Sequence, residues 1–365
     1  MQARYSNKLD YLELFELPKT VCKGFEHALQ EAATYVGQTS PNPPVGCAIL
    51  DKAGNLLACE AHHRAGEAHA EILALRRCAE RGLWEKISDV MVTLEPCNHT
   101  GQTPPCSEAL LNTPAKRIWV GMKDPNPKVC GNGNIRLRQG GKKVILLQDL
   151  SSIEAKYYYQ QCCQLLLPFT KAVTKNQAWI TVKQALSVSG SMLPPKGQKT
   201  FTSFNSLTIA HKLRRATEAI ITTAATIRAD RPNFTVRHIP DHINKKRLLV
   251  ICTRQKADLH ALCSESYLRQ AQANGFQFLV CRNLRTLPEL LYQHHVLWAM
   301  VEAGPNFLKS IQQLQIWDDW LLFQQSLGKE DTISVQSKHP LTPLSSLLTH
   351  VKFHRVKEVQ CSLVS

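Results

Sequence analysis

The sequence lacks several features that would by themselves assign it to a class of protein. It contains no apolar run long enough to cross a membrane, and residues 1–19 mix charged with apolar side chains instead of forming the core of a signal peptide. It also contains no internal repeat and no low-complexity tract. We therefore expect a globular, cytoplasmic protein without a membrane partner. A length of 365 residues is enough for two domains with separate cores.

Acidic residues are scarce relative to basic ones. The chain has 29 Asp and Glu against 44 Lys and Arg, so its formal net charge is +15 at pH 7. The basic residues are dispersed and form no block. Such an excess suits a phosphorylated small molecule, a dinucleotide cofactor or simple solubility, and nucleic acid is the less favoured partner.

Disulfide bonds are not expected. The 13 cysteines are an odd number, scattered over a long chain without a secretion signal, which indicates reduced thiols. Most of them are typical of small buried core residues. Only Cys97 and Cys106 lie in a pattern that is typical of a metal site.

That pattern consists of a His-Ala-Glu, a Pro-Cys and a Pro-Pro-Cys sequence, which supply His69, Cys97 and Cys106. Zinc binds imidazole nitrogen and thiolate sulfur, and a zinc with three protein ligands keeps a fourth position for water, as catalytic sites do. Water on such a zinc has a pKa of about 7, so a nucleophile is available near neutral pH. We expect these three residues to bind one zinc ion.

Glu71 is the expected catalytic proton carrier, because a carboxylate beside the metal can take a proton from water and pass it to a leaving amine. His69 and Glu71 are two residues apart and can share a site only at the start of a helix. The apolar spacing over residues 72–81, followed by Gly82, predicts such a helix. The proline pair before Cys106 predicts a second helix start, which would lower the pKa of that thiol.

These motifs resemble those of the zinc nucleobase deaminases, His-x-Glu and Pro-Cys-x-x-Cys. The segment between Cys97 and Cys106 is longer than usual, and the run from Thr93 to Cys106 resembles the deaminase half of the bifunctional riboflavin-biosynthesis deaminase–reductase. The resemblance implies a cytidine-deaminase-like three-layer α/β/α domain. It also implies a diaminopyrimidine substrate that carries a phosphoribosylamino group.

The resemblance further implies substrate-binding residues in the first domain. Asn42 matches the asparagine of an Asn-Pro turn, and His62 and His99 match two substrate-contacting histidines. Asp124 and Asn126 lie in a matching Asp-Pro-Asn-Pro turn. An ordinary solvated loop histidine would explain His62 and His99 equally well, and an ordinary turn asparagine is the less favoured alternative for Asn42.

The second half has no Gly-x-Gly-x-x-Gly after its first expected strand, 179–183, so a standard Rossmann site is not indicated. Residues 224–237 instead resemble a reductase motif in which an Asp-x-Pro turn presents a strand that ends in a substrate arginine. Residues 301–305 resemble a second motif, in which small residues at a helix start let N–H groups approach a phosphate. By this resemblance the domain is a dihydrofolate-reductase-like α/β domain that binds NADPH. The implied substrate-binding residues are Arg215, Phe234, Arg237 and Glu302. The implied cofactor-binding residues are Ala185, Phe201, Thr226, Asp230, Thr253 and Gly304.

Several sites depart from the family pattern. Ser-Val-Ser-Gly at 187–190 replaces Ser-Leu-Asp-Gly, Phe201 replaces a tryptophan, and residues 252–253 are Cys-Thr instead of Asp-Ser. Gln102 stands where the family commonly has a basic residue. These departures leave open a deaminase whose second domain is a degenerate reductase that serves as a scaffold.

The expected organisation is a leader at 1–20, a deaminase domain at 21–168 and a reductase domain at 176–365, with a linker over 168–176. Strands alternate with helices, which predicts layered α/β domains. The expected helices of the first domain cover 22–36, 72–81 and 152–166, and its expected strands include 90–94, 117–122 and 143–147.

The predicted function is zinc-dependent deamination of the pyrimidine, followed by NADPH-dependent reduction of its ribosyl group to ribityl, in a homo-oligomeric enzyme. Two alternatives come from other classes. A nucleic-acid deaminase with a basic targeting domain would bind with an affinity that falls steeply with salt. A zinc-stabilised binding module without activity would need a fourth protein ligand and would give Glu71 no role.

Overall fold

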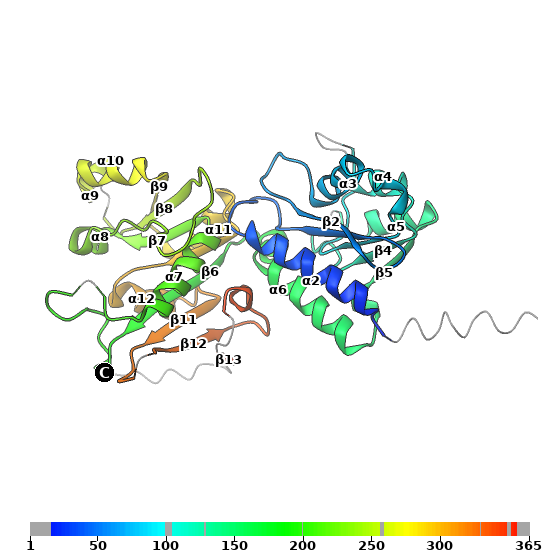
Figure 1. Cartoon of the computed structure of the whole chain (residues 1–365). Coiled ribbons are helices and arrows are strands. Elements are labelled where there is room, and N and C mark those ends of the chain that lie inside the picture. Colours follow the sequence, from blue (N-terminus) through cyan, green and yellow to red (C-terminus); the bar gives the residue numbers. More distant parts are fainter. Residues whose placement is uncertain are drawn as a thin grey trace, which may run out of the picture. The chain divides into compact units, whose positions relative to one another are not determined.

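The structure is a computed structural model that describes residues 16–98, 104–127, 129–198, 200–255, 259–328, 330–348 and 352–355, the last of these as backbone only (Figure 1). The chain divides into two compact units, residues 1–174 and 175–365. Among the described helices, none has both the length and the apolar character that a membrane span requires.

The first unit is built on a five-stranded sheet with the order β2-β1-β3-β4-β5. β1 is antiparallel to both of its neighbours, whereas β3, β4 and β5 are parallel to one another. The strands are β1 (Gly46–Leu50), β2 (Leu56–Ala61), β3 (Asp89–Val92), β4 (Arg117–Val120) and β5 (Lys143–Leu146).

Helices cover both faces of this sheet. Since successive side chains of a strand point to opposite faces, Met91 and Trp119 pack with Phe25 of α2 on one face, and Val90 and Ile118 pack against α3, α4 and α5 on the other. The helices are α2 (Lys19–Thr34), α3 (Ala70–Glu80), α4 (Cys106–Leu111), α5 (Asn132–Gln139) and α6 (Ile153–Lys175), with short 3₁₀ turns η1 (Trp84–Lys86) and η2 (Leu147–Asp149). This is the predicted three-layer α/β/α domain.

The predicted linker over 168–176 is wrong. Helix α6 continues through Pro168 and ends at Lys175. Proline removes one backbone hydrogen bond from a helix interior, but Leu165, Phe169 and Ala172 are buried on both sides of it. Tertiary packing of this apolar face therefore outweighs the local preference of proline.

The helix predicted to begin at Cys22 begins earlier, since α2 starts at Lys19. Residues 1–15 of the predicted leader lie outside the described residues.

The second unit is built on an eight-stranded sheet with the order β13-β12-β11-β6-β10-β7-β8-β9. The run from β11 to β9 is parallel, and β12 pairs antiparallel with β11. The strands are β6 (Trp179–Leu186), β7 (Ala219–Thr223), β8 (Arg247–Cys252), β9 (Phe276–Cys281), β10 (Trp298–Val301), β11 (Asp319–Gln324), β12 (Thr332–Ser337) and β13 (Lys352–Arg355).

Helices also cover both faces of the second sheet. Helices α11 and α12 pack on one face of the central strands, and α8, α9 and α10 pack on the other. The helices are α7 (Phe204–Ala216), α8 (Ala224–Asp230), α9 (Leu259–Leu262), α10 (Glu265–Ala273), α11 (Leu287–Gln293) and α12 (Pro305–Gln313), with turns η3 (Leu284–Thr286) and η4 (Pro343–Ser346). The predicted α/β class is confirmed for both domains. In parallel sheets of this kind, ligands bind at the carboxyl ends of the strands.

One carboxyl group in this domain lies in the core. Asp319 at the start of β11 is fully buried, and its Oδ2 accepts hydrogen bonds of 2.8 Å from Trp179 Nε1 and Thr342 Oγ1. Burial raises the pKa of Asp319 to about 7, although these hydrogen bonds lower it in part. In the unfolded chain an aspartate has a pKa of about 3.9.

This difference makes stability depend on pH. Between about pH 4 and pH 7 the folded protein binds a proton that the unfolded chain has released, so the free energy of unfolding falls as pH rises through this window. Asp319→Asn keeps an acceptor for Trp179 and Thr342 but carries no charge. The free energy of unfolding of the variant, relative to that of the wild type, should therefore be about 2 kcal/mol larger at pH 8 than at pH 5, since one pKa unit corresponds to about 1.4 kcal/mol. Urea unfolding at both pH values measures this, and parallel pH profiles of the two proteins would contradict it.

Candidate functional site

Three predicted metal ligands meet beyond the carboxyl end of β3. His69 is the N-cap of α3, and Cys106 is the first residue of α4. Nδ1 of His69 lies 3.5 Å from Sγ of Cys97 and 3.3 Å from Sγ of Cys106, and the Cys106 N–H donates to Sγ of Cys97 at 3.3 Å. The three ligand atoms lie within 4.8 Å of one another. Among the residues that the structure describes, no fourth ligand joins them.

The charges at this cluster suit a metal. The hydrogen bond from the Cys106 thiol lowers the pKa of Cys97 to about 4, so Cys97 is a thiolate at neutral pH. That thiolate in turn raises the pKa of His69. Its hydrogen bond with the Cys106 thiol, together with burial, raises the pKa of Cys106, so the predicted lowering of that pKa is wrong. One imidazole nitrogen and two sulfurs, with a fourth position open, are the donor set of a catalytic zinc. The residues therefore fit zinc, and they do not fit a closed structural site.

Glu71 lies in the first turn of α3, beside the cluster, and is buried. Burial raises the pKa of its carboxyl group, and the positive charge of His69 partly opposes this shift. A carboxyl group whose pKa is raised toward neutrality can both take up and release a proton. This is the property that the predicted proton carrier needs.

Asn42 and His62 adjoin the cluster as a hydrogen-bonded pair. His62 packs edge-on against His69, with ring centroids 5.4 Å apart. Its Nδ1 lies 3.1 Å from the Ala68 carbonyl oxygen, which can only accept, so Nδ1 carries the proton. Burial lowers the pKa of His62, so the ring is neutral and its Nε2 accepts from the Asn42 amide at 3.1 Å. The amide NH₂ of Asn42 is thereby engaged, and its oxygen can accept from a ligand.

The other predicted deaminase residues lie in the loop after β4. Oδ1 of Asp124 accepts the Asn126 N–H at 2.8 Å, and both residues are half-buried. The Asp124 N–H donates to Glu95, which precedes Cys97 by two residues, so this loop is tied to the metal cluster. His99 lies outside the described residues. All these binding roles stay predictions.

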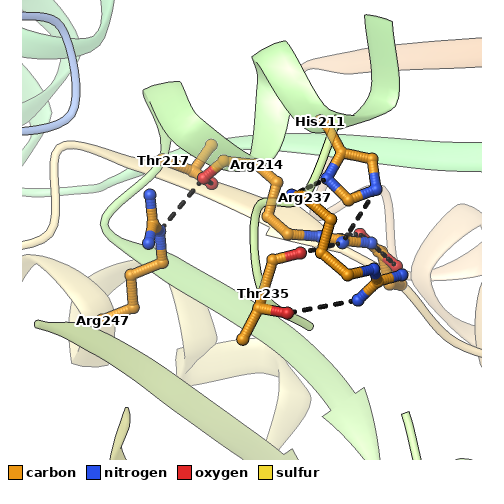
Figure 2. Close-up of polar contacts among 7 residues, drawn as sticks. His211, Arg214, Thr217, Thr235, Arg237 and Arg247 are labelled. Atoms are coloured by element: carbon orange, nitrogen blue, oxygen red, sulfur yellow. Dashed lines mark hydrogen bonds and ion pairs between the residues drawn. The ribbon is translucent and has the colours of Figure 1, made fainter. Parts of the chain in front are cut away.

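In the second domain an ion pair forms the centre of a polar cluster. The Arg214 guanidinium donates to both carboxylate oxygens of Glu302, at 2.7 and 2.9 Å, and its Nη1 donates to the Thr235 carbonyl oxygen at 2.7 Å. Figure 2 shows His211, Arg214 and Arg237 converging on this point from α7 and from the segment after α8. Nδ1 of His211 accepts the Arg237 N–H at 2.9 Å.

The charges of this cluster fix its protonation states. Burial raises the pKa of Glu302, but the charges of Arg214 and Lys183 outweigh burial and lower it, so Glu302 is ionised. Burial and the neighbouring Arg214 lower the pKa of His211 to about 3, so this ring is neutral. Burial also lowers the pKa of Lys183. A carboxylate, an arginine and a lysine thus lie together at the carboxyl end of β10, beside the middle of β6.

The structure brings together some of the predicted reductase residues and not others. Arg237 lies in the cluster, and its exposed side chain donates to Thr235 Oγ1 at 3.2 Å. Arg215 instead lies 3.4 Å from His242, and Phe234 is buried in the core between β7, β8 and α10. The arginine that pairs with Glu302 is Arg214 and not Arg215.

The sequence does not separate Arg214 from Arg215. His211 lies three residues before Arg214 and four before Arg215, and both spacings place side chains on one face of a helix. Lys183 also had no sequence signal, because a lysine near the end of an expected strand is ordinary.

The structure also brings together only some of the predicted cofactor-binding residues. The Gly304 N–H donates to Thr226 Oγ1 at 3.4 Å, which joins the starts of α8 and α12, and a side chain at Gly304 would point into open space. Thr253 lines a nearby cavity of about 630 Å³ at the ends of β7 and β8. Ala185, Phe201 and Asp230 do not line this cavity.

Of the residues that the structure describes, four arginines and no carboxylate line the same cavity: Arg228, Arg254, Arg282 and Arg285. Guanidinium groups are suited to phosphate recognition. The lining therefore fits a polyanionic ligand of nucleotide size.

Comparison with known proteins agrees with both halves of this description. Residues 19–122 match the cytidine and deoxycytidylate deaminase zinc-binding region, and residues 178–364 match the RibD C-terminal domain. The riboflavin biosynthesis protein RibD of Aquifex aeolicus is 31% identical over 312 residues, which are 81% of this chain and 84% of that protein. RibD of Escherichia coli is 38% identical over 200 residues, 54% of this chain and 51% of that protein.

Solved structures share the fold of the whole chain. Acinetobacter baumannii RibD, form 1, has a TM-score of 0.68 at 27% identity and covers 85% of this chain and 88% of its own. A Thermotoga maritima diaminohydroxyphosphoribosylaminopyrimidine deaminase/5-amino-6-(5-phosphoribosylamino)uracil reductase has a TM-score of 0.71 at 23% identity, covering 91% and 92%. Both domains and the alignment with the Aquifex protein lead to one conclusion: the chain belongs to the RibD family of riboflavin biosynthesis proteins, which join a zinc-dependent deaminase to a reductase.

Proposed function

We propose that the first domain hydrolyses the 2-amino group of 2,5-diamino-6-(5-phosphoribosylamino)pyrimidin-4(3H)-one and that the second domain reduces the ribosyl group of the product to ribityl. The observation that carries the first half is the convergence of His69, Cys97 and Cys106 beside the buried Glu71. The two activities in the name of the Thermotoga maritima protein support the choice of substrate.

In the deaminase site each residue has a distinct task. Zinc held by the three ligands would lower the pKa of a water molecule and supply a nucleophile near neutral pH. Glu71 takes up the proton of that water and passes it to the leaving amine, so the ring gains an oxygen and ammonia departs. Asn42 and the loop with Asp124 and Asn126 orient the pyrimidine. The amide oxygen of Asn42 accepts from a donor group of the ring or sugar.

In the reductase site the ion pair of Arg214 and Glu302 supports the proposal. NADPH would supply the hydride, and the arginine-lined cavity beside Thr253 would hold its phosphates. Arg237 is exposed next to the pair, so it is suited to bind the phosphate of the substrate. Lys183 is close enough to Glu302 for its charge to lower the pKa of that carboxyl group, and we assign both residues to hydroxyl groups of the opened sugar. The homo-oligomeric state and the cytoplasmic location stay predictions.

Product mass tests both activities at once. The zinc-loaded enzyme is incubated with the diaminopyrimidine, with and without NADPH, and the products are analysed by mass spectrometry. We expect replacement of one amino group by oxygen in both samples, and a further gain of two hydrogens only with NADPH. The first change alone would show that the second domain is a degenerate reductase. No change, together with nucleic-acid affinity that falls with salt, would favour the nucleic-acid deaminase.

Two substitutions separate metal binding from proton transfer. Glu71→Gln keeps the size of the side chain but cannot carry a proton, so it should retain one zinc and lose at least about 100-fold in deamination rate. Cys106→Ser removes a sulfur ligand and should lose the metal. Metal analysis and ammonia release measure the two effects, and near-normal turnover of Glu71→Gln would rule out its role as proton carrier.

Two adjacent arginines allow a matched comparison in the reductase. Arg214→Lys keeps the charge but cannot donate at once to Glu302 and Thr235, so kcat/KM of reduction should fall roughly 100-fold, which corresponds to about 2.7 kcal/mol. Arg215→Lys should cost less than about threefold, because Arg215 lies apart from Glu302. Deamination by the same chains is the internal control. A larger loss for Arg215→Lys would support the assignment from sequence instead.

A further inference from the structure

Glu95 is a buried carboxylate that holds four backbone N–H groups. It lies between the end of β3 and Cys97, and only 6% of its surface is exposed. Its Oε2 accepts from the N–H groups of Asp124 at 3.2 Å and Gly131 at 3.0 Å. Its Oε1 accepts from Gly133 at 3.1 Å and Asn134 at 3.2 Å. One side chain thus anchors a segment that lies about 30 to 40 residues further along the chain.

These contacts are strong for physical reasons. A carboxylate can only accept, and hydrogen bonds to a charged group are stronger than those between neutral groups. Gly133 and Asn134 belong to the first turn of α5, whose N–H groups have no partner within the helix and which favours a negative charge. The approach is close, because a Cβ atom added at Gly133 would lie 1.9 Å from the Pro96 carbonyl oxygen.

The anchored segment is the one that carries two predicted substrate contacts. Asp124 is held directly through its N–H, and Asn126 is held through Asp124. On its other side Glu95 is two residues from the metal ligand Cys97. The same carboxylate therefore fixes the spacing between the metal cluster and the loop.

We propose that Glu95 is a positioning residue of the deaminase, which sets Asp124 and Asn126 at a fixed distance from the zinc ligands. The inference rests on the proposed function, since it needs this loop to contact the pyrimidine. Glu95 itself does not touch the substrate. Its loss should therefore weaken substrate binding more than it slows the chemical step.

Glu95→Gln is the direct test. The substitution replaces one oxygen by an NH₂ group that faces two N–H donors, so two of the four hydrogen bonds are lost whichever oxygen is replaced. We expect KM for the pyrimidine to rise at least tenfold, with kcat within threefold of the wild type and one zinc still bound. The reductase rate of the same chain should not change. If the wild type deaminates the substrate and KM of the variant is unchanged, the proposal is wrong while the proposed function stands.

Asp89→Asn is the matched control for loss of a buried carboxylate. Asp89 is the first residue of β3, at the end away from Cys97. Its side chain is buried, with 3% of the residue exposed, and it accepts hydrogen bonds from Arg117 and Trp119. Its substitution should lower the thermal unfolding temperature without raising KM. An equal rise of KM in both variants would show that Glu95 is merely structural.

Two further measurements keep the test decisive. Cobalt substituted for zinc should give the same absorption spectrum in Glu95→Gln and in the wild type, and a changed spectrum would mean that Glu95 acts on Cys97 instead of the loop. If Glu95→Gln does not fold, Gly133→Ala displaces the start of α5 from Pro96 while Glu95 stays intact. It should also raise KM with zinc retained, and an unchanged KM would overturn the proposal.

Discussion

A metal site requires donors from distant parts of the chain to lie within a few ångströms of one another, and the first domain meets this constraint at the carboxyl end of β3. Two helices begin at this point, α3 with His69 and α4 with Cys106, and Cys97 lies in the segment that follows the strand. Helix N-termini favour negative groups, so thiolates and a carboxylate can gather there. Glu95 uses the start of α5 in the same manner. The metal ligands, the proton carrier and the loop opposite them therefore all lie near the carboxyl end of β3.

The corresponding feature of the second domain is the ion pair between Arg214 and Glu302. Glu302 directly follows β10, a central strand of the sheet, where a carboxylate without a partner would be strongly unfavourable. Arg214 reaches it from α7 with two parallel hydrogen bonds, from Nε to Oε1 and from Nη2 to Oε2, a geometry that only arginine provides. His211 stays neutral and accepts the Arg237 N–H, so it joins the helix to the segment that bears the second arginine. Both arginines are therefore held in place before any ligand arrives.

The sequence could predict those features that depend on short spacings. His69 and Glu71 are two residues apart at a helix start, and the proline pair before Cys106 marks another, so the metal cluster was visible without a structure. Features that depend on tertiary packing were not visible. The proposed role of Glu95 needs four donors from a distant segment. Helix α6 continues through Pro168 because packing of its buried face outweighs the local preference of proline. Between Arg214 and Arg215, only the facing direction of α7 distinguishes the two side chains.

The buried ion pair also bears on whether the second domain could be a mere scaffold. A buried salt bridge adds little to stability, because the cost of removing two charges from water is close to what their attraction returns, and apolar residues of similar size often stabilise as well or better. A domain kept only for its shape therefore has no physical need for Arg214 and Glu302 in its interior. The pair makes sense where a ligand uses it. The cavity beside Thr253 points the same way, because its four arginines suit an anionic ligand. Both features favour a reductase site that still binds its ligands, despite the altered residues at 187–190 and 252–253.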